Sequence, residues 1–231
     1  MKLSIIVCVL NEIKTIEKIL QKINDVELPN NIQKEIIVID NNSIDGTKEF
    51  LQKIQISENL KVFFQKKNFG KGNSIIKGIE ESSGDLIIFQ DADLEYDPKN
   101  YDKLINHLIK NNLDAVFGSR IKNDHTVFEY KINKFAVVLF TRLINFLYRG
   151  SFTDTATNHK LIKSEVLKKL NLTSKGFSLD FEVSLKLAKY NYSCDEIPIE
   201  YYPRTYKEGK KINLLDAIQS FFVILYHFFG K

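Results

Sequence analysis

The chain has 231 residues, of which 33 are Lys or Arg and 29 are Asp or Glu, so its formal net charge is +4. This length fits one α/β domain with a substantial core, and the small basic excess suits anionic ligands but is less than that of nucleic-acid-binding proteins. Nucleic acid is therefore not an expected partner, and the oligomeric state is left open. Cys8 and Cys194 match no metal-ligand spacing and no disulfide framework, so both are predicted to be reduced core residues.

The first part of the chain alternates apolar runs with amphipathic segments. A strand buried on both faces is predicted at residues 3–10, and the helix after it has Ile16, Ile19 and Ile23 on one side. Alternation of this kind predicts an α/β fold with a mostly parallel central sheet flanked by helices. Further strands are predicted at residues 35–40, 60–64, 85–90 and 115–118, and further helices at residues 50–54, 71–82 and 98–110.

Two helices in the second part of the chain are unusually apolar. The helix predicted at residues 131–149 fits a core helix and a membrane-surface helix equally well, whereas the aromatic end of the helix at residues 213–229 favours a membrane interface. Neither has an uninterrupted apolar run of about 18 residues, and the start of the chain lacks signal-peptide features, so we expect a cytoplasmic protein. The remaining predictions are a polar loop at 152–160, helices at 164–170 and 181–190, an edge strand at 195–202 and a basic loop at 204–211.

Three acids follow the apolar run at residues 86–89: Asp91, Asp93 and Glu95 stand at alternate positions. Carboxylates at the end of a strand can hold Mg²⁺ or Mn²⁺ and leave coordination positions open for the oxygens of a diphosphate. A solvated acidic turn explains an isolated pair of acids equally well, so the surrounding motifs must decide.

Three other segments suit a nucleotide ligand. Asn11 and Glu12 follow the first strand and Asp40 ends the second, so both are expected at the same sheet edge as the three acids. Asp40 can accept hydrogen bonds from a base or ribose, although the turn after it also fits a plain helix cap. Lys71 stands between two glycines ahead of a helix, which suits close backbone approach to phosphates but is weak as an isolated motif.

In this order and spacing, these segments resemble the family 2 glycosyltransferases of the GT-A fold, and most closely the branch that transfers sugars to dolichol or polyprenyl phosphate. The resemblance implies a Rossmann-like GT-A fold and a metal-dependent, inverting hexosyltransferase of cell-envelope glycan biosynthesis. Its donor would be a UDP- or GDP-sugar and its acceptor undecaprenyl or dolichyl phosphate, on the cytoplasmic face of the membrane. The matching segments are residues 9–12, 38–47, 68–72, 91–98, 118–120 and 203–211.

The resemblance and the motifs together assign roles to individual residues. The divalent cation is expected on Asp91 and Asp93, with Glu95 close by. Catalytic roles are expected for Asp93, Asp154 and Arg204, and contacts to the acceptor phosphate for Lys134, Arg204 and Lys210. Contacts to the nucleotide sugar are expected from Val9, Asn11, Glu12, Asp40, Asn42, Lys71, Gly72, Asp91, Ala92 and Arg120.

The chain also departs from the family pattern. Cys8-Val9-Leu10-Asn11-Glu12 stands where relatives usually have Pro-x-Tyr-Asn-Glu, so Leu10 replaces the Tyr, and Asn41-Asn42 stands where they have Asp-Gly. His159 stands where relatives commonly have Phe, and it is predicted either to contact a ligand or to be a satisfied loop histidine. No counterpart of the family's multi-helix membrane anchor is recognised, so we divide the chain into a catalytic domain at residues 1–212 and a membrane-interfacial helix at residues 213–231.

Two other functions were weighed against transfer to a lipid phosphate. A phosphate acceptor is already ionised, whereas a hydroxyl acceptor must lose a proton to a carboxylate, for which Asp154, Asp180 and Glu182 are the candidates. A non-catalytic, receiver-like module would leave the Gly118-Ser119-Arg120 segment and the basic loop without a role. The basic loop itself is either a phosphate site or a solvated run of charge.

Overall fold

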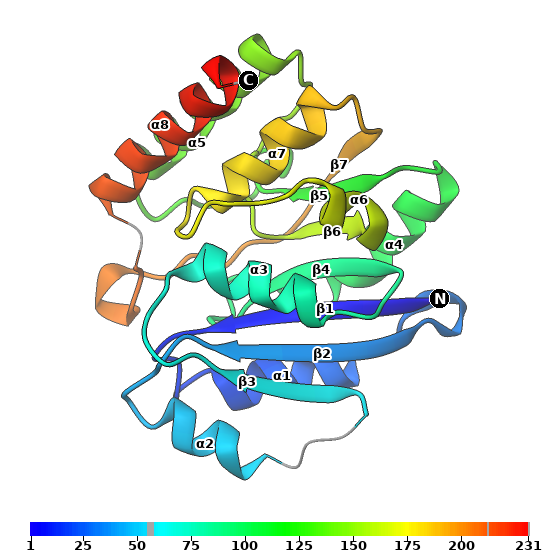
Figure 1. The fold of residues 1–231 in the computed structure, drawn as a ribbon, viewed down its shortest axis with the longest axis vertical. Coiled ribbons are helices and arrows are strands. Elements are labelled where there is room, and N and C mark those ends of the chain that lie inside the picture. Colours follow the sequence, from blue (N-terminus) through cyan, green and yellow to red (C-terminus); the bar gives the residue numbers. More distant parts are fainter. Residues whose placement is uncertain (55–57, 212, 231) are drawn as a thin grey trace.

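The computed structural model describes residues 1–54, 58–211 and 213–230, which form a seven-stranded sheet with helices on both faces (Figure 1). The strand order is β3-β2-β1-β4-β6-β5-β7. β6 is antiparallel to β4 and β5, and the other neighbouring strands are parallel. The strands are β1 (Lys2–Val9), β2 (Gln33–Asp40), β3 (Leu60–Phe64), β4 (Leu86–Asp91), β5 (Ala115–Ser119), β6 (Lys160–Lys163) and β7 (Cys194–Pro198).

β1 is central because its side chains enter the core on both faces of the sheet. Leu3, Ile5 and Val7 pack in one core with α1 and α4, and Ile6 packs in the other with α3. This confirms the strand predicted to be buried on both faces, and it explains the apolar run, since each face must be covered. The helices are α1 (Ile16–Asp25), α2 (Thr47–Lys53), α3 (Lys71–Glu81), α4 (Asn100–Lys110), α5 (Lys131–Tyr148), α6 (Ser164–Lys169), α7 (Leu179–Lys189) and α8 (Leu214–Phe229), with short 3₁₀ turns at Pro29–Asn31 and Tyr206–Glu208.

The predicted elements are confirmed with two exceptions near the end of the sheet. The strand predicted at 195–202 ends at Pro198, and the chain then makes only an isolated bridge between Tyr201 and Tyr96. β7 lies at the sheet edge, as Pro198 indicated. β6 was not predicted, because its four residues, Lys-Leu-Ile-Lys, are too short to show a period. The structure inserts it between β4 and β5, where Leu161 and Ile162 are fully buried.

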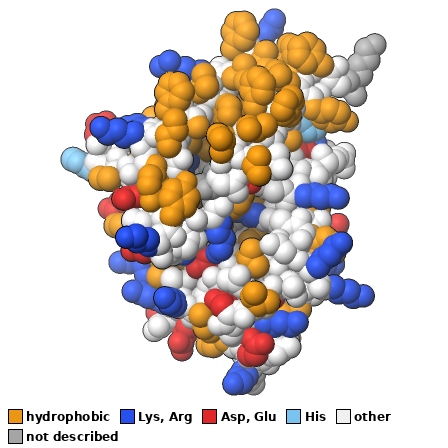
Figure 2. All heavy atoms as spheres, turned by 90° about the vertical axis from the view of Figure 1, so that its left-hand side faces the viewer, with side chains coloured by type: hydrophobic (Ala, Val, Ile, Leu, Met, Phe, Trp, Pro, Cys, Tyr) orange, Lys and Arg blue, Asp and Glu red, His pale blue; other side chains and the backbone are white. Residues whose placement is uncertain are grey.

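α5 and α8 form an outer layer on α7. Ile144, Tyr148 and Ile224 join the core that α7 lines, and the Tyr148 hydroxyl donates to the carbonyl of Ile224 at 2.6 Å. Most of the exposed side chains of both helices are apolar, and Figure 2 shows the resulting patch at one end of the molecule. No helix in the described ranges is long and apolar enough to cross a membrane. Positions 212 and 231, which bound the predicted domains, lie outside the described residues.

Candidate active site

The polar segments after β1 and β2 meet at the carboxyl edge of the sheet, as predicted. The backbone N–H of Asn11 donates to the Ser43 hydroxyl at 2.8 Å, and the Asn11 side chain accepts from the backbone N–H of Ile44 at 2.8 Å. The backbone N–H of Glu12 donates to the Thr47 hydroxyl at 2.9 Å. Asn11 has φ of 51°, a left-handed conformation that Asn tolerates. The two loops therefore hold each other in place without a ligand.

Asp40 is fully buried at the end of β2. Its Oδ2 accepts from the backbone N–H of Ser43 at 3.2 Å, whereas its Oδ1 accepts from none of the described residues. A buried acceptor without a partner is costly, so this oxygen has capacity for a ligand donor. Asn42, two residues on, has φ of 66° and is half-buried at the same edge. The side chains of Val9 and Ala92 are in the core, so only their main chains can touch a nucleotide.

The side chains of Asp91, Asp93 and Glu95 do not all lie on the same face of an extended strand. Asp91 ends the strand, and Leu94 has φ of 67°, a left-handed turn that directs Glu95 away from the other two. Glu95 instead accepts from the Tyr201 hydroxyl at 2.7 Å and from the backbone N–H of Arg204 at 2.7 Å. The alternate spacing places the three acids on one face only if the strand continues beyond Asp91, but β4 ends there. In this structure the two Glu95 oxygens are used by donors of the chain, so Glu95 as a metal ligand stays a prediction.

Asp91 and Asp93 fit a divalent cation as a pair. Among the described ranges, no group of three or more His, Cys, Asp or Glu side chains is arranged to hold a metal. Burial raises the pKa of Asp93 to about 7, with Asp91 and Glu95 adding to the rise and Arg204 opposing it. Burial also raises the pKa of Asp91, which Lys71 partly opposes. Two largely buried carboxylates, each with one cation of the chain beside it, are a donor set that Mg²⁺ or Mn²⁺ suits.

The glycines around Lys71 have a different role from the predicted one. A Cβ on Gly72 would lie 2.3 Å from the carbonyl oxygen of Ser174, and a Cβ on Gly70 would lie 2.3 Å from that of Lys175. The backbone N–H of Asn73 donates to the same Lys175 carbonyl at 3.1 Å. The close backbone approach is therefore to the chain's own loop ahead of α7, and Gly72 is not placed to bind a phosphate here.

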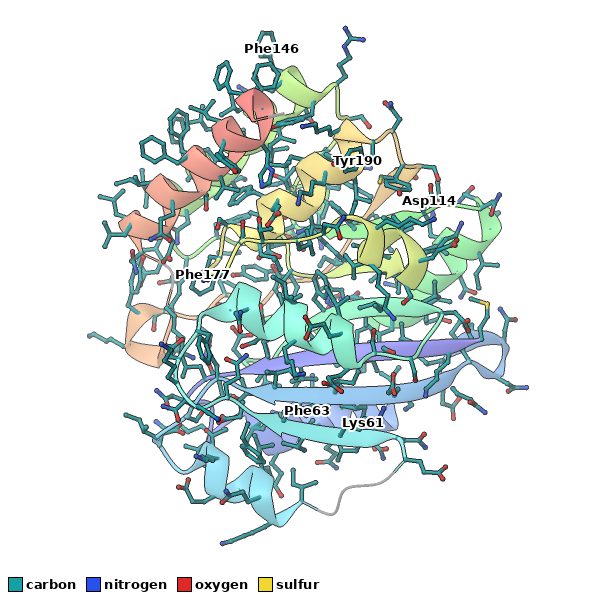
Figure 3. The ribbon with its side chains drawn as sticks, viewed as in Figure 1. Lys61, Phe63, Asp114, Phe146, Phe177 and Tyr190 are labelled. Atoms are coloured by element: carbon teal, nitrogen blue, oxygen red, sulfur yellow. The ribbon has the colours of Figure 1, made fainter. Side chains whose placement is uncertain are left out.

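Lys71 itself points into the site. Its Nζ lies 3.0 Å from Asp91 and 3.7 Å from Asp180, and 5.5 Å from the centre of the Phe177 ring, which is labelled beside the start of α3 in Figure 3. Burial alone would lower the pKa of Lys71, but Asp91 and Asp180 outweigh it and the net shift is upward. Asp180 also lies 3.5 Å from the Nζ of the fully buried Lys160. Asp91, Lys71, Asp180 and Lys160 therefore form a row of alternating negative and positive charges.

Arg120 and Asp154 are each other's partners. Nε of Arg120 donates to Oδ2 of Asp154 at 2.7 Å and Nη2 donates to Oδ1 at 2.8 Å. Burial would raise the pKa of Asp154, but Arg120 outweighs it and the net shift is downward. A buried carboxylate in a two-point ion pair is a poor proton acceptor. The ion pair with Arg120 therefore does not favour Asp154 as a catalytic base, and a catalytic role for Asp154 stays a prediction.

Glu182 also makes structural contacts with both of its carboxylate oxygens. It accepts from the backbone N–H groups of Thr173 and Ser174, at 3.0 and 2.7 Å, and pairs with Lys186 at 2.6 Å. These contacts anchor the loop that covers Gly70 and Gly72. Glu182 is fully buried, so its role in this structure is to fix that loop.

The cations predicted to bind the acceptor lie around two aromatic rings that the sequence did not single out, Phe128 and Tyr201. Lys134 Nζ lies 5.6 Å from the centre of the Phe128 ring, and the guanidinium of Arg120 lies 5.5 Å from Phe128 and 5.2 Å from Tyr201. Lys210 Nζ donates to the Tyr201 hydroxyl at 3.4 Å and to Glu95 at 3.5 Å. Tyr201 lies in the predicted strand at residues 195–202 but beyond the observed end of β7 at Pro198, so the strand pattern gave no sign of its central position.

Arg204 reaches the two acidic clusters. Its Nη2 donates to Asp93 at 3.0 Å, and its Nη1 donates to Glu12 at 2.9 Å. Lys211 also pairs with Glu12. The basic loop is therefore folded onto the site and is not a solvated run of charge, although Lys207 and Glu208 are exposed.

His159 is not the satisfied loop histidine that was one of the two predictions for it. It is fully buried between Tyr96 and Tyr101, with ring centres 5.4 and 5.6 Å away. Both of its ring nitrogens lack a hydrogen-bond partner among the described residues. Burial lowers the pKa of His159 to about 3, so it is a neutral aromatic residue.

A model of the family described as Glycosyl transferase family 2 matches residues 4–170. The chain belongs to this family. This family 2 glycosyltransferase is 29% identical over 214 residues to the dolichol-phosphate mannosyltransferase of Pyrococcus furiosus. The match covers 91% of this chain and 59% of that protein. It is 25% identical over 213 residues to the glycosyltransferase AglJ of Haloferax volcanii, covering 90% of this chain and 66% of that one.

Solved structures confirm the GT-A fold of this glycosyltransferase. Glucosyl-3-phosphoglycerate synthase from Mycobacterium tuberculosis, in complex with Mn²⁺, UDP and phosphoglyceric acid, has a TM-score of 0.69 at 17% identity, covering 99% of this chain and 78% of that one. TarS from S. aureus, in complex with UDP-GlcNAc, has a TM-score of 0.62 at 17% identity, covering 97% and 65%. The name of the Pyrococcus furiosus relative agrees with the predicted branch of the family.

Proposed function

We propose that this glycosyltransferase moves a hexose from a UDP- or GDP-sugar to a polyprenyl phosphate, with inversion at the anomeric carbon, on the inner surface of the cell membrane. The observation that carries the proposal is the position of the acceptor cations beside an apolar face. Lys134 is in the first turn of α5, next to Ile132 and Phe135, which are 70% and 63% exposed. A phosphate carried on an isoprenoid chain requires cations and apolar surface side by side.

The basic loop is tied to the same end of α5. The backbone N–H of Tyr206 donates to the Tyr130 hydroxyl at 3.2 Å, and the two rings are 4.7 Å apart. α8, which starts after this loop, adds Phe222 and Phe229, which are 63% and 74% exposed. Figure 2 shows Lys and Arg side chains scattered around and below the apolar patch, mixed with Asp and Glu. We propose that residues 1–212 form the catalytic domain and that the helix beyond them lies peripherally in the membrane interface.

The state of the three candidate bases supports an acceptor that is already ionised. Asp154 is paired with Arg120, Glu182 with backbone N–H groups and Lys186, and Asp180 lies between Lys71 and Lys160. The cations beside Asp154 and Glu182 lower the pKa of both carboxyl groups against the effect of burial, so these two carboxylates are poor proton acceptors. A hydroxyl acceptor needs such a proton transfer, whereas a phosphate needs only alignment of its oxygen.

We also propose that Asp91 and Asp93 hold Mg²⁺ or Mn²⁺ during the reaction. When bound, the cation would offset the charge that develops on the leaving diphosphate. The chain itself would supply Lys71 beside that diphosphate, Asp40 for the nucleoside, and Arg204 with Lys210 for the acceptor phosphate. The Mn²⁺ and UDP named with the mycobacterial synthase support this arrangement by similarity of fold.

A donor screen tests the proposal. Purified protein is incubated with Mn²⁺ and a panel of UDP- and GDP-sugars, with and without a short polyprenyl phosphate. We expect one donor to be consumed faster when the lipid phosphate is present, with a glycosyl lipid phosphate as product. If no donor is consumed under either condition while Mn²⁺ binding is intact, the transferase assignment of this site is wrong.

A further inference from the structure

Glu12 and Arg204 form a two-point ion pair across the active-site edge. Nη1 of Arg204 donates to Oε2 at 2.9 Å, and Nη2 donates to Oε1 at 3.2 Å. Lys211 donates to Oε1, and the Thr15 hydroxyl donates to Oε2 at 3.1 Å. Both oxygens of Glu12 are therefore used by donors of the chain itself. Only 8% of the side chain is exposed, which leaves little of it for a nucleotide.

Arg204 has a second anionic partner, whose role would change when a metal binds. Its Nη2 also donates to Oδ2 of Asp93 at 3.0 Å. A divalent cation on Asp93 would withdraw charge from that oxygen and repel the guanidinium, so this contact would weaken. Glu12 is the anion that would keep Arg204 in the site.

One donor of Arg204 is unused. Its Nε is buried and has no hydrogen-bond partner among the residues that the structure describes. A desolvated guanidinium N–H without an acceptor is unfavourable, and phosphate oxygens are acceptors that match the guanidinium fork. Because Glu12 accepts from Nη1 and Nη2 of Arg204, Nε remains available to donate to a further anion.

We propose that Glu12 is a positioning residue for the acceptor: it fixes the guanidinium of Arg204, so that Nε, and Nη2 once Asp93 has bound metal, bind the acceptor phosphate. This replaces the nucleotide contact expected for Glu12 and rests on the proposed function for the identity of the acceptor. It also gives an order of binding. The donor and its metal enter first, because they free Nη2 from Asp93, and the lipid phosphate enters second.

The test is a double-mutant cycle of Glu12→Gln and Arg204→Ala. Glu17→Gln is the matched control, because it removes one exposed carboxylate from the start of α1. Calorimetry measures the affinity for Mn²⁺ with the nucleotide diphosphate, and kinetics at saturating donor measure the KM for a short polyprenyl phosphate. Thermal unfolding verifies that each variant is folded.

We expect Glu12→Gln alone to raise the acceptor KM by about tenfold or more, and Glu12→Asp to recover part of the loss. In the Arg204→Ala background, Glu12→Gln should change neither the KM nor the Mn²⁺ and nucleotide affinity by more than about twofold, because Glu12 acts through Arg204. Glu17→Gln should match the wild type.

The proposal is overturned if Glu12→Gln weakens nucleotide binding by about tenfold in the Arg204→Ala background as well, since Glu12 would then contact the nucleotide directly. The calorimetric measurement needs no acceptor, so it tests the Glu12–Arg204 pair separately from the proposed function. If the wild type transfers sugar only to a hydroxyl acceptor, the lipid-phosphate function is rejected. The acceptor role of Glu12 is then rejected too, even if the double-mutant cycle shows that Glu12 and Arg204 are coupled.

Discussion

The ammonium of Lys71, at the start of α3, lies 3.0 Å from the carboxylate of Asp91, at the end of β4. The same ammonium lies 3.7 Å from Asp180, so Lys71 has a second anion available on α7. Arg204 stands in the corresponding position beside Asp93. Each acid proposed to bind the metal is therefore balanced by a cation of the chain, and a divalent ion would compete with both.

Asp91→Asn and Asp93→Asn should each abolish transfer and weaken Mn²⁺-dependent nucleotide binding. Each change removes a charged ligand but keeps the shape, at a cost of about 1.5 to 3 kcal/mol in binding, or roughly tenfold or more. Glu95→Gln serves as the comparison. This substitution should weaken metal binding less, because Glu95 is held by Tyr201 and Arg204. Calorimetry with Mn²⁺ and UDP or GDP measures the difference. Near-normal turnover of either Asn variant at limiting Mn²⁺ would contradict the metal assignment.

Asp154→Asn should act through Arg120 and not through proton transfer. Removing one partner of a buried ion pair leaves an uncompensated charge and should lower the free energy of unfolding by about 3 to 5 kcal/mol. The double variant Asp154→Asn with Arg120→Gln should be no less active than Arg120→Gln alone. Urea unfolding and transfer rates across pH provide the two readouts. A further large loss of kcat in the double variant would instead indicate that Asp154 is a base.

His159→Phe should stabilise the protein. The change removes two buried ring nitrogens that lack partners, each worth about 1 to 3 kcal/mol when unsatisfied, and keeps the stacking between Tyr96 and Tyr101. A gain of about 1 kcal/mol would raise the Tm by about 2 to 4 °C for a chain of this size. Differential scanning calorimetry at neutral pH measures it.

The gain should also depend on pH in a defined direction. The pKa of His159 is lowered to about 3 in the folded state, so between pH 6.5 and 3 the unfolded chain binds a proton that the folded chain does not. Wild-type stability is therefore lost as the pH falls below about 6.5, by up to roughly 1.4 kcal/mol per pH unit from this group, and His159→Phe lacks that loss. A difference between the two proteins that stays constant from pH 7.5 to 5 would contradict the buried neutral state of His159.

Membrane docking is tested by exposed aromatic residues of α8. Phe222→Ser with Phe229→Ser should reduce flotation with acidic vesicles, because both side chains are more than half exposed and their loss leaves the core intact. Tyr190→Ser is the matched control, an aromatic residue 54% exposed at the end of α7 and labelled in Figure 3. If wild type and double variant float equally little, α5 and α8 are not a docking surface.

Most of the fold followed from local pattern, whereas much of the site did not. Strand and helix periods gave β1 to β5 and the converging edge, because those signals are carried by neighbouring residues. β6 was too short for a pattern, and its burial comes from its neighbours β4 and β5. Glu95 was misplaced because a single left-handed residue, Leu94, reverses its direction. The contacts of Asp154 and Gly72 could not be predicted, because their partners, Arg120 and the loop at Ser174, are distant in the sequence.

The most direct measurement compares two acceptors that differ only in charge. Wild-type enzyme, saturated with its donor and Mn²⁺, is given a short polyprenyl phosphate or the matching neutral polyprenol, and radiolabelled sugar in the lipid fraction is counted. We expect rapid transfer to the phosphate and none above background to the alcohol, with Arg204→Ala impairing the former. Equal transfer to both lipids, or transfer to the alcohol alone, would contradict the proposal that the cations around Tyr201 and Arg204 receive the acceptor's phosphate.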